Sequence, residues 1–210
     1  MAPVVQISLV IGTRNRKKGA ELAELIAPWG IDAVTLADLP QSVDIEETGK
    51  TFAANAALKS TQQAKHLSRW VLADDSGLEV DALGGAPGVY SARFAGPDAT
   101  DDANNRRLLE LLRHAPLEER DARYVCHVTL ADPSGTIRAE SHETCHGRIR
   151  FEPAGTNGFG YDPLFEIVEY HRTFGELGPH VKRAISHRAR ALRTILPKLV
   201  ALIAGGENRV

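Results

Sequence analysis

Residues 70–94 read WVLADDSGLEVDALGGAPGVYSARF, in which an apolar run is followed at once by two adjacent carboxylates, a serine and a glycine. The run at 70–73 is typical of a short buried strand, where a charge is costly unless it is paired or bound to a metal. The sequence therefore predicts that Asp74 and Asp75 lie where this strand has just ended, at the mouth of a cleft.

The composition is that of a globular enzyme. A chain of 210 residues can bury a large core, and it fits one α/β domain or two closely joined lobes. The formal charge of -2 provides no overall field for nucleic acid or anionic lipid, so we expect a small-molecule partner and neither a nucleic acid polymer nor a membrane. The N-terminus lacks a signal-peptide pattern, and two cysteines cannot form a disulfide framework, so we expect a cytoplasmic protein.

Strand and helix patterns alternate along the chain. Apolar spacing and turn residues predict strands at 4–11 and 31–36, a helix beginning at Lys17 with Trp29 on its buried face, a helix over 51–67, and a helix capped by Thr100. The alternating runs at 123–131 and 136–145 flank Asp-Pro-Ser-Gly and predict an antiparallel hairpin. A last helix should span about 186–205, with Pro197 kinking or dividing it. The fold class is therefore α/β, with one mixed sheet continuing through both halves.

A basic turn lies between the first strand and the first helix. Helix N-termini offer unpaired amides and a partial positive charge, so lysines added there favour a phosphate cradle, although a solvated basic turn explains the pattern equally well. The turn is not a P-loop, since the position five before Gly49 of Gly-Lys-Thr holds Asp44. The residues of this turn are Thr13, Arg14, Asn15, Arg16, Lys17 and Lys18.

Four acids on two predicted loops suggest a metal site. Glu46 and Glu47 precede a helix, where the helix dipole alone would favour them. Together with Asp74 and Asp75 they are enough to hold Mg²⁺, which takes a few carboxylates and completes its octahedron with water and phosphate oxygens. His127, His142 and His146 with the two cysteines do not favour zinc, because the hairpin register places the thiols far apart.

Two further segments carry ligand-binding residue types. In Asn-Gly-Phe-Gly-Tyr-Asp-Pro at 157–163, glycines flank an aromatic ring, which suits a ring presented to a ligand as well as a tight turn with a buried Phe159. Lys182, His187 and Arg188 lie near the start of the last helix, as donors to a ligand or as an ordinary surface cap.

Five blocks in this order resemble the inosine/xanthosine triphosphate pyrophosphatase family, over about residues 5–199. They are T-x-N-x-x-K-x-x-E-L at 13–22, EETGKTFAANAALKS at 46–60, ADDSGLEVDALGGAPGVYSARF at 73–94, EPAGTNGFGYDPLF at 152–165 and AISHRARAL at 184–192. The resemblance implies a single domain, 1–210, of two lobes with the active-site cleft between them and a long mixed sheet. It also implies a homodimer and Mg²⁺-dependent hydrolysis of ITP, dITP and XTP to the monophosphate and pyrophosphate.

The resemblance also implies a role for each matching residue. Asp75 would be the general base for the attacking water, and Glu46, Glu47, Asp74 and Asp75 would form the metal cluster. Phe159 would stack on the base, with Gly160, Tyr161 and Asp162 completing that loop. Lys182, His187 and Arg188 would contact the base, ribose or phosphate. The triphosphate contacts would be Thr13, Asn15, Lys18, Lys59 and Ser76, with Arg14, Arg16 and Lys17 in the same basic turn.

The chemistry of these residues agrees with that reaction. Lysines and Mg²⁺ neutralise the leaving pyrophosphate while a carboxylate orients water, and donors such as Arg188 and protonated His187 match a 6-oxo purine but not adenine. Arg14, Ala54 and His180-Val181 depart from the family pattern without removing a catalytic group, and Arg14 offers an added phosphate contact. The alternatives are a pyrophosphatase for modified pyrimidines or standard nucleotides, a nucleotide- or RNA-binding module without turnover, and a phosphatase that releases single phosphates.

Overall fold

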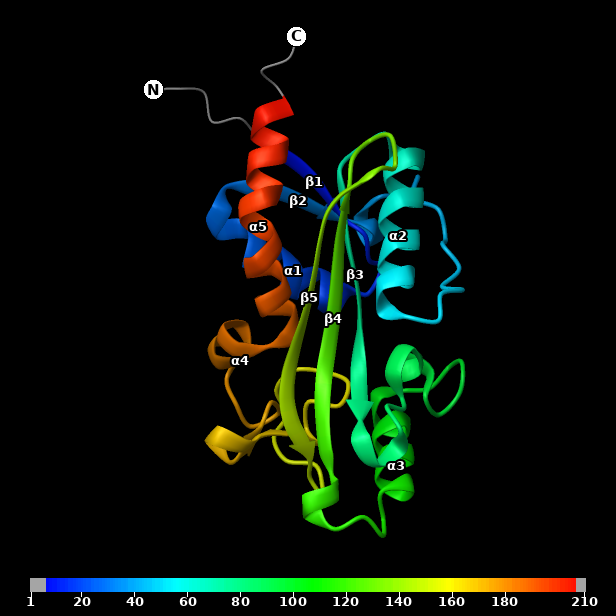
Figure 1. Cartoon of the computed structure of the whole chain (residues 1–210), viewed down its shortest axis with the longest axis vertical. Coiled ribbons are helices and arrows are strands. Elements are labelled where there is room, and N and C mark those ends of the chain that lie inside the picture. The colour runs from blue at the N-terminus through cyan, green and yellow to red at the C-terminus, as the bar shows by residue number, and fades with distance from the viewer. Residues whose placement is uncertain (1–6, 207–210) are drawn as a thin grey trace. The chain divides into compact units, whose positions relative to one another are not determined.

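The computed structural model describes residues 7–206, where seven strands and five α-helices are found (Figure 1). Residues 4–6 of the predicted first strand lie outside this range. The strands are β1 (Ile7–Ile11), β2 (Ile31–Thr35), β3 (Val71–Val80), β4 (Asp121–Ala131), β5 (Ile137–Ile149), β6 (Phe165–Ile167) and β7 (Arg172–Thr173). The helices are α1 (Arg16–Ile26), α2 (Phe52–Leu67), α3 (Asp101–Leu111), α4 (Pro179–Ile185) and α5 (His187–Gly206).

The strands of residues 7–206 form one mixed sheet in the order β2-β1-β3-β4-β5-β6-β7. β1 pairs in parallel with β2 and with β3, and the β5–β6 and β6–β7 pairs are antiparallel. β4 and β5 are neighbours joined by a turn too short for a crossover, so they form the predicted hairpin. The expected α/β class with a mixed sheet flanked by helices is confirmed.

Short polar side chains fix where the helices begin. Thr51 caps α2 by accepting from the backbone N–H of Ala54 at 3.1 Å, and Thr100 caps α3 by accepting from that of Ala103 at 3.2 Å. Each cap satisfies an amide that has no partner inside the helix. Both helices therefore start where the sequence predicts.

The chain divides into two compact units. The first comprises residues up to 75, 126–143 and from 188 onward, and the second comprises 76–125 and 144–187. β3, β4 and β5 contribute residues to both. The expected cleft between two lobes stays a prediction.

In the first unit, helices cover both faces of the sheet. Leu22 and Ile26 of α1 and Leu192 and Leu196 of α5 pack with Leu72 on one face. On the other face, Ala64 of α2 packs in a second cluster whose further members are Val10, Leu36, Val71 and Ala131. In Figure 1, α5 (red) and α2 (cyan) accordingly lie on opposite sides of the strands.

In the second unit, aromatic side chains build the core. Phe165, Phe174 and Tyr124 contact one another, with ring centroids 4.6 Å apart for Tyr124–Phe165 and 5.6 Å apart for Phe165–Phe174. Leu108 of α3 and Leu78 of β3 are buried in the same cluster. This core supports the segment at 157–163.

One expectation about the helices is wrong, and of the two alternatives for Pro197 only division of the last helix is excluded. Trp29 was predicted on the buried face of the first helix, but that helix ends at Ile26 and the side chain of Trp29, in the following 3-10 turn, is 47% exposed. α5 continues through Pro197 and is not divided there. None of the helices in residues 7–206 combines the length and apolarity needed to cross a membrane.

Candidate active site

Asp74 and Asp75 lie inside β3, which runs on to Val80, and not after the end of a strand. The prediction of a strand that stops at residue 73 is therefore wrong. Both carboxylates are buried, with exposed fractions of 1% and 5%. Because successive side chains of a strand point to opposite faces, the two acids meet different partners. Those partners are basic or amide groups, which is why the strand tolerates two buried acids.

Asp74 is held by the first turn of α5. The Nε atom of Arg188 donates to Asp74 Oδ2 at 3.3 Å, and Nη1 of the same guanidinium donates to Glu21 of α1. Arg188 is 2% exposed. Burial opposes its charge, but Asp74 and Glu21 outweigh burial and raise the pKa of Arg188. The guanidinium that was expected to contact substrate is thus engaged by two carboxylates of the protein.

Asp75 is held by α2. Lys59 Nζ donates to Asp75 Oδ1 at 3.0 Å and to Glu47 Oε1 at 3.1 Å, and Asn55 Nδ2 donates to Asp75 Oδ2 at 3.1 Å. Burial raises the pKa of Asp75, while Lys59 and Lys18 act in the opposite direction. Burial disfavours the charge of Lys59, yet Asp75, Asp74 and Glu47 raise its pKa above the ordinary value. The result is a carboxylate more basic than a solvent-exposed aspartate, beside a charged lysine.

Asn55 is a site residue that the sequence did not single out. Its Oδ1 accepts from the backbone N–H of Gly49 at 2.8 Å, so its Nδ2 is directed at Asp75. A side chain at Gly49 would come within 2.5 Å of that oxygen, so only glycine fits. The sequence shows only an amide among alanines; its full burial, which makes partners necessary, is a property of the fold.

The basic turn forms the N-terminus of α1 in the same unit. Asn15 caps the helix by accepting from the N–H groups of Lys17 at 3.0 Å and Lys18 at 3.1 Å. Thr13 Oγ1 accepts from the N–H of Asn15 at 3.2 Å. These amides are already used, so phosphate binding at this turn would rest on its side chains. Arg16 and Lys17 are exposed and Lys18 is half-buried.

The guanidinium of Arg14 is paired with other side chains of the protein. Its Nε lies 3.0 Å from Asp44 Oδ1, and its Nη2 donates to Ser42 at 2.9 Å. The added phosphate contact expected from Arg14 would require it to leave these partners.

In the second unit, Asp162 organises the glycine-flanked loop. Its Oδ2 accepts from the N–H of Phe159 at 2.8 Å and from Lys182 Nζ at 2.6 Å, and its Oδ1 accepts from Tyr124 OH at 3.2 Å. Lys182 Nζ also lies 4.5 Å from the centroid of the Phe159 ring. The lysine thus contacts both the loop's carboxylate and its aromatic face.

His187 and Tyr161 have supporting contacts in this unit. The His187 ring stacks on Tyr124 with centroids 4.7 Å apart. Tyr161 is buried, and its OH donates to the carbonyl of Ser91 at 2.8 Å. Burial, with a contribution from Asp101, raises the pKa of Tyr161. Ser76, which follows Asp75 in β3, is half-buried.

The predicted cluster of four carboxylates does not form in residues 7–206. No three His, Cys, Asp or Glu side chains of the described chain are arranged to hold a metal. Asp74 faces Arg188 and Asp75 faces α2, while Glu46 is exposed. Glu47 and Asp75 both form ion pairs with the ammonium group of Lys59.

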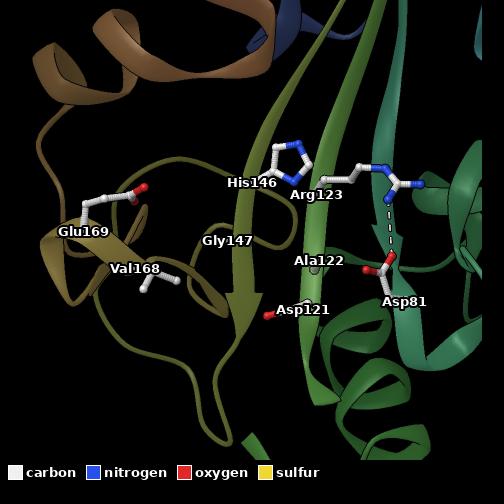
Figure 2. Close-up of a pocket in the computed structure, with 8 residues that line it drawn as sticks. All are labelled: Asp81, Asp121, Ala122, Arg123, His146, Gly147, Val168 and Glu169. Atoms are coloured by element: carbon white, nitrogen blue, oxygen red, sulfur yellow. Dashed lines mark hydrogen bonds and ion pairs between the residues drawn. The ribbon is translucent and has the colours of Figure 1, made fainter. Parts of the chain in front are cut away.

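A pocket of about 210 Å³ in the second unit contains none of the predicted site residues (Figure 2). Two of its lining residues form an ion pair, with Arg123 Nη1 3.3 Å from Asp81 Oδ1. Three carboxylates against one arginine make this lining a poor match for a triphosphate. The lining residues are Asp81, Asp121, Ala122, Arg123, His146, Gly147, Val168 and Glu169.

Comparisons with known proteins cover nearly the whole chain. The family model of the Ham1 family matches residues 9–198. A dITP/XTP pyrophosphatase of Rhodopirellula baltica is 54% identical over 200 residues, which is 95% of this chain and 96% of that protein. A HAM1 protein from Coxiella burnetii has a solved structure with a TM-score of 0.83 and 39% identity, covering 92% of this chain and 98% of its own. A nucleoside-triphosphatase, or dITP/XTP pyrophosphatase, from Mycobacterium abscessus has a TM-score of 0.73 and 42% identity, covering 91% and 100%.

Proposed function

The chain belongs to the Ham1 family, and on that premise we propose that it hydrolyses ITP, dITP and XTP to the nucleoside monophosphate and pyrophosphate. The reaction would remove non-standard purine nucleotides from the triphosphate pool. One observation carries the proposal beyond family membership: Lys59 bridges the buried carboxylate of Asp75 and that of Glu47. This arrangement pairs a base of raised pKa with a positive charge for phosphate.

We propose Asp75 as the general base. A carboxylate whose pKa is raised by burial accepts a proton from water more readily than an exposed aspartate. Asn55 and Lys59 donate to its two oxygens and so fix its orientation. Orienting water for in-line attack on a phosphorus atom is the contribution expected of such a group.

A divalent metal suits the donor set of Glu47 and Asp75. Mg²⁺ is commonly bound by one or two carboxylates and substrate phosphate oxygens, so the absence of a three-acid cluster in residues 7–206 is compatible with it. The carboxylates of Glu47 and Asp75 share the Lys59 ammonium group, so their surroundings favour positive charge. When bound, Mg²⁺ would neutralise charge on the phosphates. Asp74, which is paired with Arg188, would then support Asp75 from the opposite face of β3.

Positive and polar side chains at the start of α1, on α2 and on β3 would bind the triphosphate. The charge of Lys18 lowers the pKa of Asp75, so Lys18 acts electrostatically on the proposed base. Lys59 can contact phosphate while it remains charged. The full set proposed is Thr13, Asn15, Lys18, Lys59 and Ser76, with Arg14, Arg16 and Lys17 adding positive charge around them.

The base would be recognised by the loop at 157–163 and its neighbours. Phe159 offers a ring for stacking, and Gly160, Tyr161 and Asp162 hold that ring in place. Lys182 and His187 are candidate donors to the 6-oxo group that hypoxanthine and xanthine share, and adenine would leave such donors unpaired. We assign Arg188 a supporting role through Asp74, because both carboxylates of its ion pairs belong to the protein.

The proposal extends to assembly and location. We propose a homodimer, as the family resemblance implies, and a cytoplasmic enzyme, since its substrates belong to the nucleotide pool. Size-exclusion chromatography with light scattering tests the first point, and an elution mass of one chain would contradict it.

The decisive experiment is hydrolysis of ITP, XTP, GTP and ATP by purified protein with Mg²⁺, with pyrophosphate and orthophosphate scored separately. Pyrophosphate from ITP and XTP, with little from GTP and ATP, is the expected result. Release of orthophosphate would point to a phosphatase, and indifference to the base would contradict the proposed selectivity. Nucleotide binding without product would indicate a binding module.

A further inference from the structure

Helix α3 forms hydrogen bonds with the loop that carries Phe159, and both go to one loop residue, Gly160. The N–H of Gly160 donates to Asp101 Oδ2 at 2.9 Å, and its carbonyl accepts from Asn105 Nδ2 at 3.0 Å. Asp101 and Asn105 are four positions apart on α3, so they lie one above the other on the same helix face. Both polar groups of one loop residue are therefore fixed by one helix.

These two hydrogen bonds matter because the glycines of the loop allow its backbone many conformations. Gly158 and Gly160 have φ angles of +76° and +63°, in the left-handed region that glycine enters at little cost. Without hydrogen bonds from the loop to the rest of the protein, the ring of Phe159 between them would have many available orientations. Asp162 fixes it from within the loop through the N–H of Phe159, and α3 fixes the next residue from outside.

Hydrogen bonds and packing hold α3 in place within the second unit, so α3 can fix the position of Gly160. Asn104 accepts from the N–H of Ala95 at 2.9 Å and donates to the carbonyl of Ala92 at 3.1 Å. Leu108, one turn further on, is fully buried in the aromatic core of the second unit. The side chains that hold Gly160 thus come from a helix fixed by hydrogen bonds and by packing.

We propose that Asp101 and Asn105 are positioning residues for purine recognition, which rests on the proposed function of Phe159 as the base-stacking ring. Both would act through Gly160, the residue that follows Phe159 in the chain. Their role is to hold the Phe159 ring in the orientation that accepts a base. Losing this role would weaken binding of the base in the ground state and the transition state alike, which raises KM and leaves kcat nearly unchanged.

Four single variants separate this role from a general effect on α3. Asp101→Ala removes the acceptor for Gly160, and Asp101→Asn restores an acceptor without the charge. Asp102→Ala is the matched control, because Asp102 is an exposed neighbour in the same first turn and its loss has the same effect on the helix dipole. Asn105→Leu removes the donor, together with a buried Oδ1 that has no hydrogen-bond partner in the described chain, so its cost in folding is limited.

The measurement is the KM and kcat for ITP, beside the inhibition constant of inorganic tripolyphosphate, which carries no base. For Asp101→Ala and Asn105→Leu we expect KM to rise about fivefold to tenfold, the effect of losing one hydrogen bond. The tripolyphosphate inhibition constant and kcat should stay within about twofold of the wild type, and Asp101→Asn and Asp102→Ala should resemble the wild type.

The proposal would be overturned by an absent effect or by an unspecific one. The first is an unchanged KM in both Asp101→Ala and Asn105→Leu. The second is an equal rise in KM and in the tripolyphosphate inhibition constant, or an equal effect of Asp102→Ala, which would mean that α3 acts through overall folding. Failure of the proposed function is distinguishable, because the wild-type protein itself would then release no pyrophosphate from ITP.

Discussion

The ammonium group of Lys59 lies 3.0 Å from the carboxylate of Asp75 and 3.1 Å from that of Glu47, so one cation joins two acids. The three side chains come from α2, from β3 and from the segment before α2, and all belong to the first unit. This bridge joins the carboxylate that we propose as the general base to the one that we propose as a metal ligand.

Removing Lys59 and removing Glu47 should shift the pKa of Asp75 in opposite directions. Burial raises this pKa, Lys59 lowers it and Glu47 raises it, so Lys59→Met should raise it further and Glu47→Gln should lower it. Carbon-detected NMR titration of the metal-free protein measures the change. Since the folded pKa lies above the unfolded one, this group favours folding most at low pH, and that contribution is lost as pH rises through the folded pKa. Shifts of the same sign in both variants would contradict this account.

Asp75→Asn should abolish turnover while the protein stays folded. The amide cannot accept a proton from water, and general-base catalysis is worth about 10²–10⁴-fold in rate. Pyrophosphate release from ITP measures the loss, and the thermal unfolding midpoint serves as the control for folding. A folded variant with wild-type kcat would exclude Asp75 as the base.

The two adjacent glutamates should differ in metal dependence. Glu47 shares the Lys59 ammonium group with Asp75, whereas Glu46 is exposed. We expect chelation of Mg²⁺ to stop turnover, and Glu47→Gln to raise the Mg²⁺ concentration for half-maximal rate by about tenfold or more. Glu46→Gln is the matched control and should change it little. Equal values for the two variants would argue against Glu47 as a ligand.

Arg188→Met should act mainly on stability. It leaves the buried Asp74 without its guanidinium, and breaking a buried ion pair costs about 3–5 kcal/mol in the free energy of unfolding. Urea denaturation measures this cost, with Arg190→Met, an exposed arginine two positions on, as the control at below about 0.5 kcal/mol. Adding Asp74→Asn to Arg188→Met should restore part of the loss. A stable Arg188→Met variant with a raised KM would favour direct contact with substrate.

Two glycines of the Phe159 loop should tolerate alanine unequally. Both have positive φ, but a Cβ at Gly158 would lie 2.0 Å from Asp162 Oδ2, whereas a Cβ at Gly160 has no atom within 4 Å. Each alanine costs about 1–2 kcal/mol in backbone strain, and Gly158→Ala should also displace the carboxylate that binds Lys182. The KM for ITP should therefore rise more in Gly158→Ala than in Gly160→Ala. Equal rises in the two variants would show that backbone strain alone decides, and the reverse order would contradict the role given to Asp162.

Local patterns were predictable because their causes are local. Thr51 and Thr100 cap helices with amides three residues away, and Asp132 in the Asp-Pro-Ser-Gly turn accepts from the N–H of Ser134 at 2.9 Å. Each of these contacts is set by neighbours in the sequence. The order of motifs likewise identified the family without any spatial information.

The sequence by itself determined the alternation of strands and helices, the helix starts, the hairpin and the family. Only the tertiary structure decided that β3 continues through Asp74 and Asp75, and that the two acids serve different partners. A buried strand tolerates charge only if opposite charge arrives from elsewhere, and Arg188 lies 114 positions after Asp74 while Lys59 lies 16 before Asp75. Burial and ion pairing depend on such distant contacts, which is why local spacing placed these carboxylates at the end of a strand and the fold places them within it.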